Sequence, residues 1–175
     1  MALFPSHPSD AKISVTKLDA AKRQLRTAIT LWFMEEDPVS IHELTHSLFR
    51  QRGFSGLLYD NKLVKEEYRG ELAKRLKRFT TFFKHAQIDP NGEIEFDPTL
   101  NEGLLVLVTV GIQTIDPQIG PIETSFLHWV ALHRPDIYAL GKEFELQVSA
   151  ETLSSLRNMG RRVYFKTYHA GPGIA

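Results

Sequence analysis

The chain has 175 residues and is 42% hydrophobic, which is enough for one core or for a core with a small appendage. Its 21 basic and 21 acidic residues cancel, so no overall field favours binding to nucleic acid or to an anionic membrane. The lack of cysteine excludes disulfides, thiolate metal sites and cysteine nucleophiles, and the N-terminal segment lacks the basic and apolar parts of a secretory signal. We therefore expect a soluble cytoplasmic protein that does not enter a membrane.

The first half of the chain has the periodicity of helices. After a loose tail over residues 1–12, a first helix is predicted from Thr16, which forms a capping box with Asp19, to about residue 35. Asp37 and Pro38 are typical of a helix start and predict a second helix that ends near Gly53. A third helix is predicted over residues 65–86, with apolar side chains on one face and charges on the other.

Residues 97–115 form the centre of the predicted fold. Asp97 and Pro98 again indicate a helix start, and from Leu104 to Val110 the helix has no wholly polar face. This apolar run is far shorter than the ~20 residues that cross a bilayer, so other helices must cover it on all sides. A fifth helix is predicted over residues 121–133, ending before Pro135.

The last part of the chain has a different pattern. Apolar and polar residues alternate over 144–148 and again over 163–167, which is typical of strands, and a short capped helix is predicted between them over residues 149–158. Two strands bury too little to stand alone. We therefore expect this unit to pack on the helices, to add residues 93–96 as a third strand, or to pair across a dimer.

The predicted fold class is mainly α. It consists of an antiparallel helical bundle over residues 13–140 and a small strand-helix-strand appendage over residues 141–175. A homodimer is expected for two reasons. The central helix has more apolar surface than its neighbours obviously cover, and the predicted strands need an edge to pair with.

Several short motifs occur in order along residues 13–135: RQL and AI within 23–29, DPVSIH at 37–42, FFKHA at 82–86, DP at 89–90 and EF at 95–96. Together they resemble an uncharacterised family of small bacterial helical proteins. The resemblance implies a helical fold and marks His42, Lys84 and His85 as family-type positions, which makes them candidate binding residues. It implies no activity, substrate or catalytic residue.

Residues 42–46 match the pattern H-E-x-x-H of zinc hydrolases. Residues four apart share one face of a helix, so His42 and His46 could hold Zn²⁺ while Glu43 polarises the bound water. The alternative is a solvated helix whose histidines are in register by chance. The positions around the helix favour this alternative, because His42 lies at the border of the apolar arc, His46 outside it and Glu43 almost opposite.

Arg78 and His85 form an R-x₆-H pattern that is similar to the one in the HEPN group of small helical dimers, many of which are ribonucleases. The resemblance implies that His85 acts as acid or base and that Arg78 holds a phosphate. One copy places the two side chains roughly 10 Å apart along the helix, so a two-fold dimer would be needed to bring them together. The alternative is a solvated basic face.

The remaining candidates have structural interpretations. The aromatic residues at 79–83 and 126–129 are expected in the core. His128 and His133 are expected to line the end of the fifth helix, where a cation suits the helix dipole. A basic and aromatic cluster near the C-terminus is interpreted as a partner surface or a solvated edge; it consists of Arg157, Arg161, Arg162, Tyr164, Lys166 and Tyr168.

These observations favour an interaction or regulatory module that acts as a homodimer, with another protein as a candidate partner. They leave an enzymatic activity open but do not favour it. No cofactor and no nucleic-acid partner are expected. The alternatives are the zinc hydrolase, with His42 and His46 as metal ligands and Glu43 as catalytic residue, and the HEPN-like ribonuclease, with Arg78 and His85 as catalytic residues.

Overall fold

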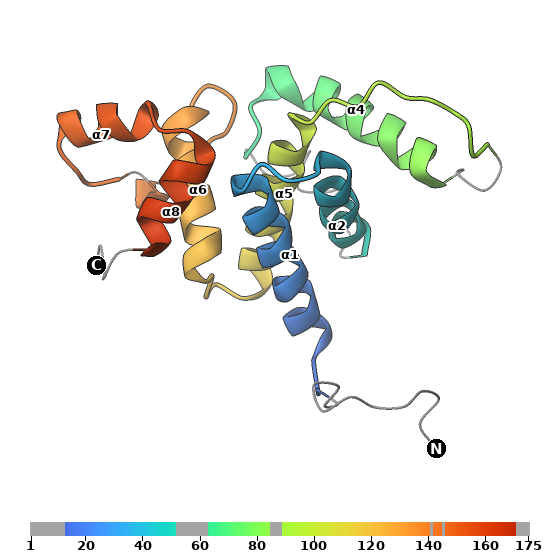
Figure 1. Ribbon diagram of the computed structural model, residues 1–175, viewed down its shortest axis with the longest axis horizontal. Coiled ribbons are helices and arrows are strands. Elements are labelled where there is room, and N and C mark those ends of the chain that lie inside the picture. The colour runs from blue at the N-terminus through green and yellow to red at the C-terminus, as the bar shows by residue number, and fades with distance from the viewer. Residues whose placement is uncertain (1–12, 52–62, 85–88, 141, 145, 171–175) are drawn as a thin grey trace.

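The computed structural model describes residues 13–51, 63–84, 89–140, 142–144 and 146–170. Within these ranges the protein is mainly helical, as predicted, with seven α-helices and a short 3₁₀ helix (Figure 1). None of the described helices has the length and apolarity needed to cross a membrane. The predicted tail over residues 1–12 and the predicted helix end at Gly53 lie outside the described residues.

The helices begin close to where the sequence predicts them. Their bounds are α1 (Lys17–Phe33), α2 (Pro38–Gln51), α4 (Glu66–Lys84), α5 (Leu100–Ile115), α6 (Pro121–His133), η2 (Lys142–Phe144), α7 (Ala150–Arg157) and α8 (Arg161–Ala170).

The predicted capping signals are confirmed at α1, α2 and α7. Thr16 Oγ1 accepts a hydrogen bond from the amide of Asp19 at 3.0 Å, and Asp19 accepts one in return from the amide of Thr16. The carboxylate of Asp37 accepts from the amide of Ser40 at 2.9 Å, at the start of α2. Ser149 accepts from the amide of Thr152 at 3.2 Å, at the start of α7. Each side chain satisfies an amide that has no partner within its helix.

Helix α5 is the centre of the fold, as predicted. Eleven of its 16 residues are buried, and α1, α2, α4 and α6 all contact it (Figure 1). It begins at Leu100 and not at the predicted Asp97, because Asp97 accepts a hydrogen bond from the amide of Thr99 at 3.0 Å and thereby closes a turn before the helix.

The predicted strand over residues 163–167 is wrong, because these residues belong to helix α8. Alternation would place Val163 and Phe165 on one face, yet Val163 is 56% exposed whereas Tyr164 is fully buried. Tyr164, Phe165 and Tyr168 share one side of a helix instead, and the ring of Phe165 stacks on Phe33 of α1 with 4.8 Å between centroids.

The other predicted strands are also missing from the described residues. Residues 142–144 form the 3₁₀ helix η2, and residues 93–96 have no regular structure. In the ranges that the structure describes, β pairing is limited to an isolated bridge between Val64 and Tyr138. Phe144 and Tyr164 join the same hydrophobic core as α1 and α6, so the C-terminal part is a helical extension of the bundle.

Both arguments for a homodimer lose their basis. The apolar residues of α5 from Leu104 to Val108 are buried within one chain, and the strands that were to pair across a dimer are not found among the described residues. The homodimer stays a prediction.

Candidate functional site

The H-E-x-x-H helix is predicted from the sequence to be a solvated surface helix. This prediction is wrong for the side of the helix that carries the two histidines. His42 is fully buried and His46 is 7% exposed, whereas Glu43 is exposed as predicted. Helix α2 packs on both α1 and α5, and the ring of His42 also contacts Phe79 of α4 and Phe96 at centroid distances of 5.6 and 5.4 Å. The sequence pattern of α2 alone did not reveal this additional covering layer.

One ring nitrogen of His42, Nδ1, makes a hydrogen bond within the core. Asn101 of α5 donates from its amide nitrogen to the carbonyl of Pro38 at 2.8 Å, so its side-chain oxygen faces His42 Nδ1, at 3.1 Å, and accepts from it. Burial lowers the pKa of His42, although the hydrogen bond to Asn101 opposes this effect. His42 is thus a neutral residue that links α2 to the first turn of α5.

The two histidines do not have the arrangement of a zinc site. Their rings stack face to face, 5.6 Å apart and 9° from parallel, whereas zinc ligands direct ring edges at one metal. Among the described residues, no group of three or more His, Cys, Asp or Glu side chains could hold a metal ion. The described residues therefore supply no third protein ligand for zinc, and metal analysis of the purified protein is the test of the zinc hypothesis.

Of the two residues of the ribonuclease hypothesis, the structure describes Arg78 only. Arg78 is exposed on α4, where it lines an open cavity of about 760 Å³ together with Arg75 and Phe79. Arg75 in that cavity already pairs with Glu71 and Asp97, both at 2.7 Å. His85 and the side chain of Lys84 lie outside the described residues.

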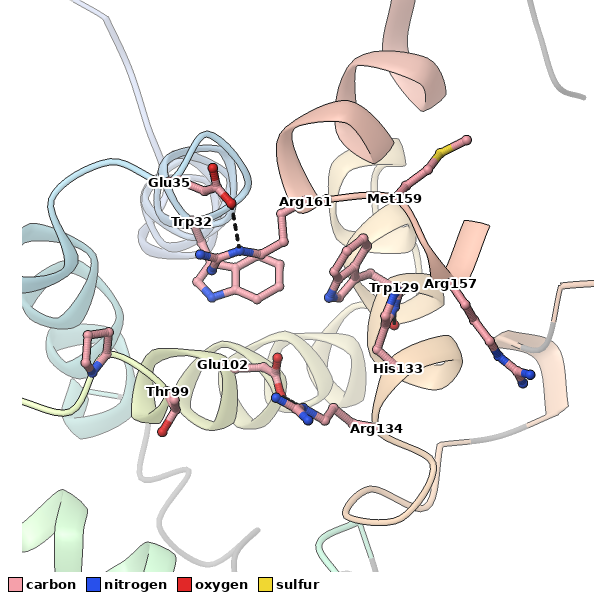
Figure 2. Close-up of a pocket in the computed structure, with 12 residues that line it drawn as sticks. Trp32, Glu35, Thr99, Glu102, Trp129, His133, Arg134, Arg157, Met159 and Arg161 are labelled. Carbon is pink, nitrogen blue, oxygen red and sulfur yellow. Dashed lines mark hydrogen bonds and ion pairs between the residues drawn. The ribbon is translucent and has the colours of Figure 1, made fainter. Parts of the chain in front are cut away.

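A second cavity, of about 500 Å³, lies where five helices end or begin, and we call it the helix-end cavity (Figure 2). The C-terminal ends of α1, α6 and α7 meet the first turns of α5 and α8 there. Its lining residues are Trp32, Glu35, Pro98, Thr99, Glu102, Trp129, His133, Arg134, Arg157, Met159, Gly160 and Arg161. Both tryptophans of the chain are among them.

The aromatic part of the helix-end cavity is rigidly packed. Trp32 of α1 and Trp129 of α6 meet edge to face, with centroids 6.2 Å apart, and each is largely buried. His133 stacks on Trp129 at 3.7 Å and donates from Nδ1 to the Trp129 carbonyl at 2.9 Å, so it lines the end of α6 as predicted. Its Nε2 is buried and has no hydrogen-bond partner among the described residues.

Arg161 and Glu35 form one side of the helix-end cavity. The guanidinium of Arg161 lies over the ring of Trp32, 4.5 Å from its centroid, and its Nε is 3.7 Å from the Glu35 carboxylate. Glu35 has φ of 58°, in the left-handed region that glycine favours. The amides of Glu35 and Glu36 bond the carbonyls of Trp32 and Leu31, which is a Schellman motif at the end of α1.

Glu102 and Arg134 form the opposite side of the cavity. Arg134 Nε donates to the Glu102 carboxylate at 3.1 Å, and the Glu102 side chain is only 13% exposed. Burial raises the pKa of Glu102, while Arg134 and, to a lesser extent, Arg161 oppose the shift. A carboxylate that is buried and faces two arginines is the most strongly perturbed acid of this site.

Comparison with known proteins adds no assignment. No family model, no curated protein and no solved structure matches this chain. The resemblance to the bacterial helical family is thereby left untested, and the site must be argued from its own geometry.

Sequence reasoning found only part of the helix-end cavity. It placed Arg157 and Arg161 in one basic cluster and His133 in another group, and it missed Glu102 and Trp32 as site residues. One signal was present: Glu102 is the one acidic residue in the apolar helix α5, where a charge needs a partner. The positions of Arg134 and Arg161 could not be predicted, because both depend on how helix ends meet.

Proposed function

We propose that this protein is a binding module and that the helix-end cavity is its ligand site. The observation that carries the proposal is the convergence of both tryptophans, two glutamate-arginine pairs and a buried imidazole on one cavity of about 500 Å³. Ligand sites typically have volumes of about 300–1,000 Å³ and combine aromatic walls with a few oriented polar groups. Perturbed acids such as Glu102 are also concentrated at functional sites.

The proposal is for binding and not for catalysis. Two patterns would imply a catalytic mechanism, H-E-x-x-H and R-x₆-H, and their described residues, His42, Glu43, His46 and Arg78, do not line the helix-end cavity. Within the cavity, the acid Glu102 is held by Arg134 and the imidazole of His133 by a backbone carbonyl. Such fixed groups suit recognition of a ligand.

Two sequence predictions remain as proposals beside this one. The antiparallel course of neighbouring helices and the homodimer are both compatible with ligand binding, but the proposal needs neither, because one chain supplies every residue that lines the cavity. Light scattering of the purified protein measures the oligomeric state independently.

The test uses the two tryptophans as reporters. A fragment library that contains anions, neutral compounds and cations is screened by the two indole N–H signals in a two-dimensional NMR spectrum. Because the chain has two tryptophans and both line the cavity, a fragment that binds there shifts these signals. We expect at least one chemical class of fragments to bind saturably.

A blocking variant shows whether binding occurs in the cavity. Gly160 lines it, and a Cβ at Gly160 would meet no atom within 4 Å, so Gly160→Leu adds a side chain to the cavity without a backbone clash. Gly70 on α4 is equally open and lies outside the cavity, so Gly70→Leu is the matched control. We expect binding to be lost in Gly160→Leu and kept in Gly70→Leu. Indole signals that no fragment shifts would refute the proposed function.

A further inference from the structure

The charges of the helix-end cavity point to the chemical class of its ligand. We propose that the cavity binds a compact anionic group, a carboxylate or a phosphate, between the guanidinium groups of Arg134 and Arg161. This inference rests on the proposed function, since it names the ligand class of the same site.

The first argument is a surplus of hydrogen-bond donors. A guanidinium has five N–H donors in a planar fork that matches carboxylate and phosphate oxygens. Among the described residues, Arg134 makes one side-chain hydrogen bond, to Glu102. Arg161 is 3.7 Å from Glu35, beyond hydrogen-bond distance, so this pair is a charge contact only. Most donors of both arginines are therefore open to a ligand.

The second argument is that the two arginines line the same cavity from two sides. Arg134 Nε lies 3.1 Å from the Glu102 carboxylate, and the guanidinium of Arg161 lies over Trp32. Glu102 is thus an internal carboxylate that already holds one of the two guanidinium groups of the cavity. An external anion bound there would take over the donors that Glu102 now uses.

The third argument concerns the remaining charges. Arg157 also lines the cavity, at its edge, and its side chain is directed away from Trp32 in Figure 2. Arg134 and Arg161 balance Glu35 and Glu102 when both acids are ionised, so Arg157 leaves one positive charge in excess at the edge of the cavity. The potential at that edge therefore favours the approach of an anion.

A cationic ligand fits less well, although two tryptophans and two glutamates are the components of an ammonium cage. The face of Trp32 is already covered by the guanidinium of Arg161 at 4.5 Å, and the face of Trp129 by His133 at 3.7 Å. An external cation would have to displace Arg161 or His133, and in either case it would meet the positive arginines.

The test uses four probes on one aromatic frame: benzoate, phenyl phosphate, neutral benzyl alcohol and the cation benzylammonium. Binding is measured by tryptophan fluorescence and by the indole N–H signals at constant ionic strength. We expect saturable binding of benzoate or phenyl phosphate and none of the other two probes. The preferred anion then distinguishes a carboxylate ligand from a phosphate ligand.

Three variants distinguish anion binding in the cavity from general binding to the protein surface. Glu102→Gln removes the competing carboxylate, so we expect it to bind the anion roughly tenfold more tightly, which corresponds to about 1.4 kcal/mol. Arg161→Gln removes one half of the clamp and should weaken binding by roughly tenfold or more. Arg162→Gln is the matched control, because the neighbouring Arg162 is exposed, bonds the Met34 carbonyl and does not line the cavity.

Each outcome decides the inference. If benzyl alcohol or benzylammonium binds as well as the anions and Gly160→Leu blocks it, the proposed site stands and the anion assignment is wrong. If the anions bind but Arg161→Gln and Arg162→Gln weaken them equally, the anions sit elsewhere and the inference is overturned. If circular dichroism shows that Arg161→Gln is unfolded, the double variant Glu102→Gln with Arg134→Gln is compared with Glu102→Gln alone, and the loss of Arg134 should then weaken anion binding by roughly tenfold or more.

Discussion

His42 Nδ1 donates to the side-chain oxygen of Asn101 at 3.1 Å, and the amide of Asn101 donates onward to the carbonyl of Pro38 at 2.8 Å. This short relay joins His42 and Pro38 of α2 to Asn101 in the first turn of α5. Asn101 is 1% exposed and His42 is fully buried, so water does not reach the His42 side of this relay. The relay is the most buried polar connection between two helices of the bundle that we describe.

We expect Asn101→Ala to lower the free energy of unfolding by about 1–3 kcal/mol, because it leaves the His42 donor and the Pro38 acceptor buried without Asn101. Urea unfolding followed by circular dichroism measures the loss. Asn158→Ala is the control, since Asn158 is an exposed residue at the end of α7. A loss no larger than that of the control would show that the relay does not stabilise the fold.

The burial of His42 predicts a pH dependence of stability. Because burial lowers its pKa below 6.5, the unfolded chain takes up a proton at a higher pH than the folded chain. The contribution of His42 to the free energy of unfolding is therefore complete above pH 6.5. It falls as the pH drops below 6.5, by at most about 1.4 kcal/mol per pH unit for one group. We expect His42→Gln to show a smaller loss between pH 7.5 and pH 5.5.

The control for His42→Gln is Glu43→Gln, which changes an exposed residue of the same helix. It should reproduce the pH dependence of the unaltered protein. If His42→Gln does so too, the protonation of His42 does not limit stability in acid.

Glu102 predicts the opposite pH dependence. Burial raises its pKa above 4.5, against the effects of Arg134 and Arg161, with Asp136 also nearby and Tyr138 sensing its charge. Its contribution to stability is complete below pH 4.5 and is lost as the pH rises through its pKa in the folded protein. Glu102→Gln keeps the shape without the charge, so we expect a higher melting temperature than that of the unaltered protein at pH 7.

The pH dependence of this difference is the check. Below pH 4.5 the carboxyl is neutral in both states, and the two melting temperatures should approach each other. A Glu102→Gln variant that is less stable at pH 7 would mean that the bond to Arg134 outweighs the cost of burying the charge.

The backbone conformation of Glu35, which lines the cavity, is expected to lower the free energy of unfolding. It occupies the left-handed position of a Schellman motif, where glycine is usual, and its carboxylate lies beside Arg161. Glu35→Gly should raise the free energy of unfolding by roughly 1 kcal/mol, because glycine adopts positive φ without strain. Glu35→Ala removes the same carboxylate but keeps the Cβ, so it should give no gain. Equal effects of the two substitutions in urea unfolding would show that backbone strain at residue 35 is negligible.

The zinc hypothesis has a direct test as well. Because the two imidazoles stack and the described residues include no group of three metal ligands, we expect added Zn²⁺ to leave the melting temperature of the protein within about 1 °C. A ligand at 100 times its Kd would instead add about 2.7 kcal/mol to the free energy of unfolding. Metal analysis of the purified protein is the second readout. A zinc-induced rise that His46→Ala abolishes, while His169→Ala does not, would restore the metal site.

The sequence by itself determined the helical class, most helix boundaries and the central position of α5. These features depend on local chemistry: the Thr16 and Ser149 caps, the proline that starts α6, and the apolar run of α5 that has to be covered. Each can be predicted from residues a few positions apart, because the groups that decide it lie within one or two helical turns.

Only the tertiary structure decided which polar residues are buried and which residues from distant parts of the sequence come into contact. His42 is covered because Phe79 and Phe96 come to lie against α2, and residues 161–170 form a helix because Tyr164 finds a buried place beside α1 and α6. The helix-end cavity depends on the meeting of five helix ends, and two of its residues, Glu102 and Arg161, are 59 positions apart in sequence. Periodicity within one helix records its own apolar face but not which other segments will pack on it, and so it could not predict these contacts.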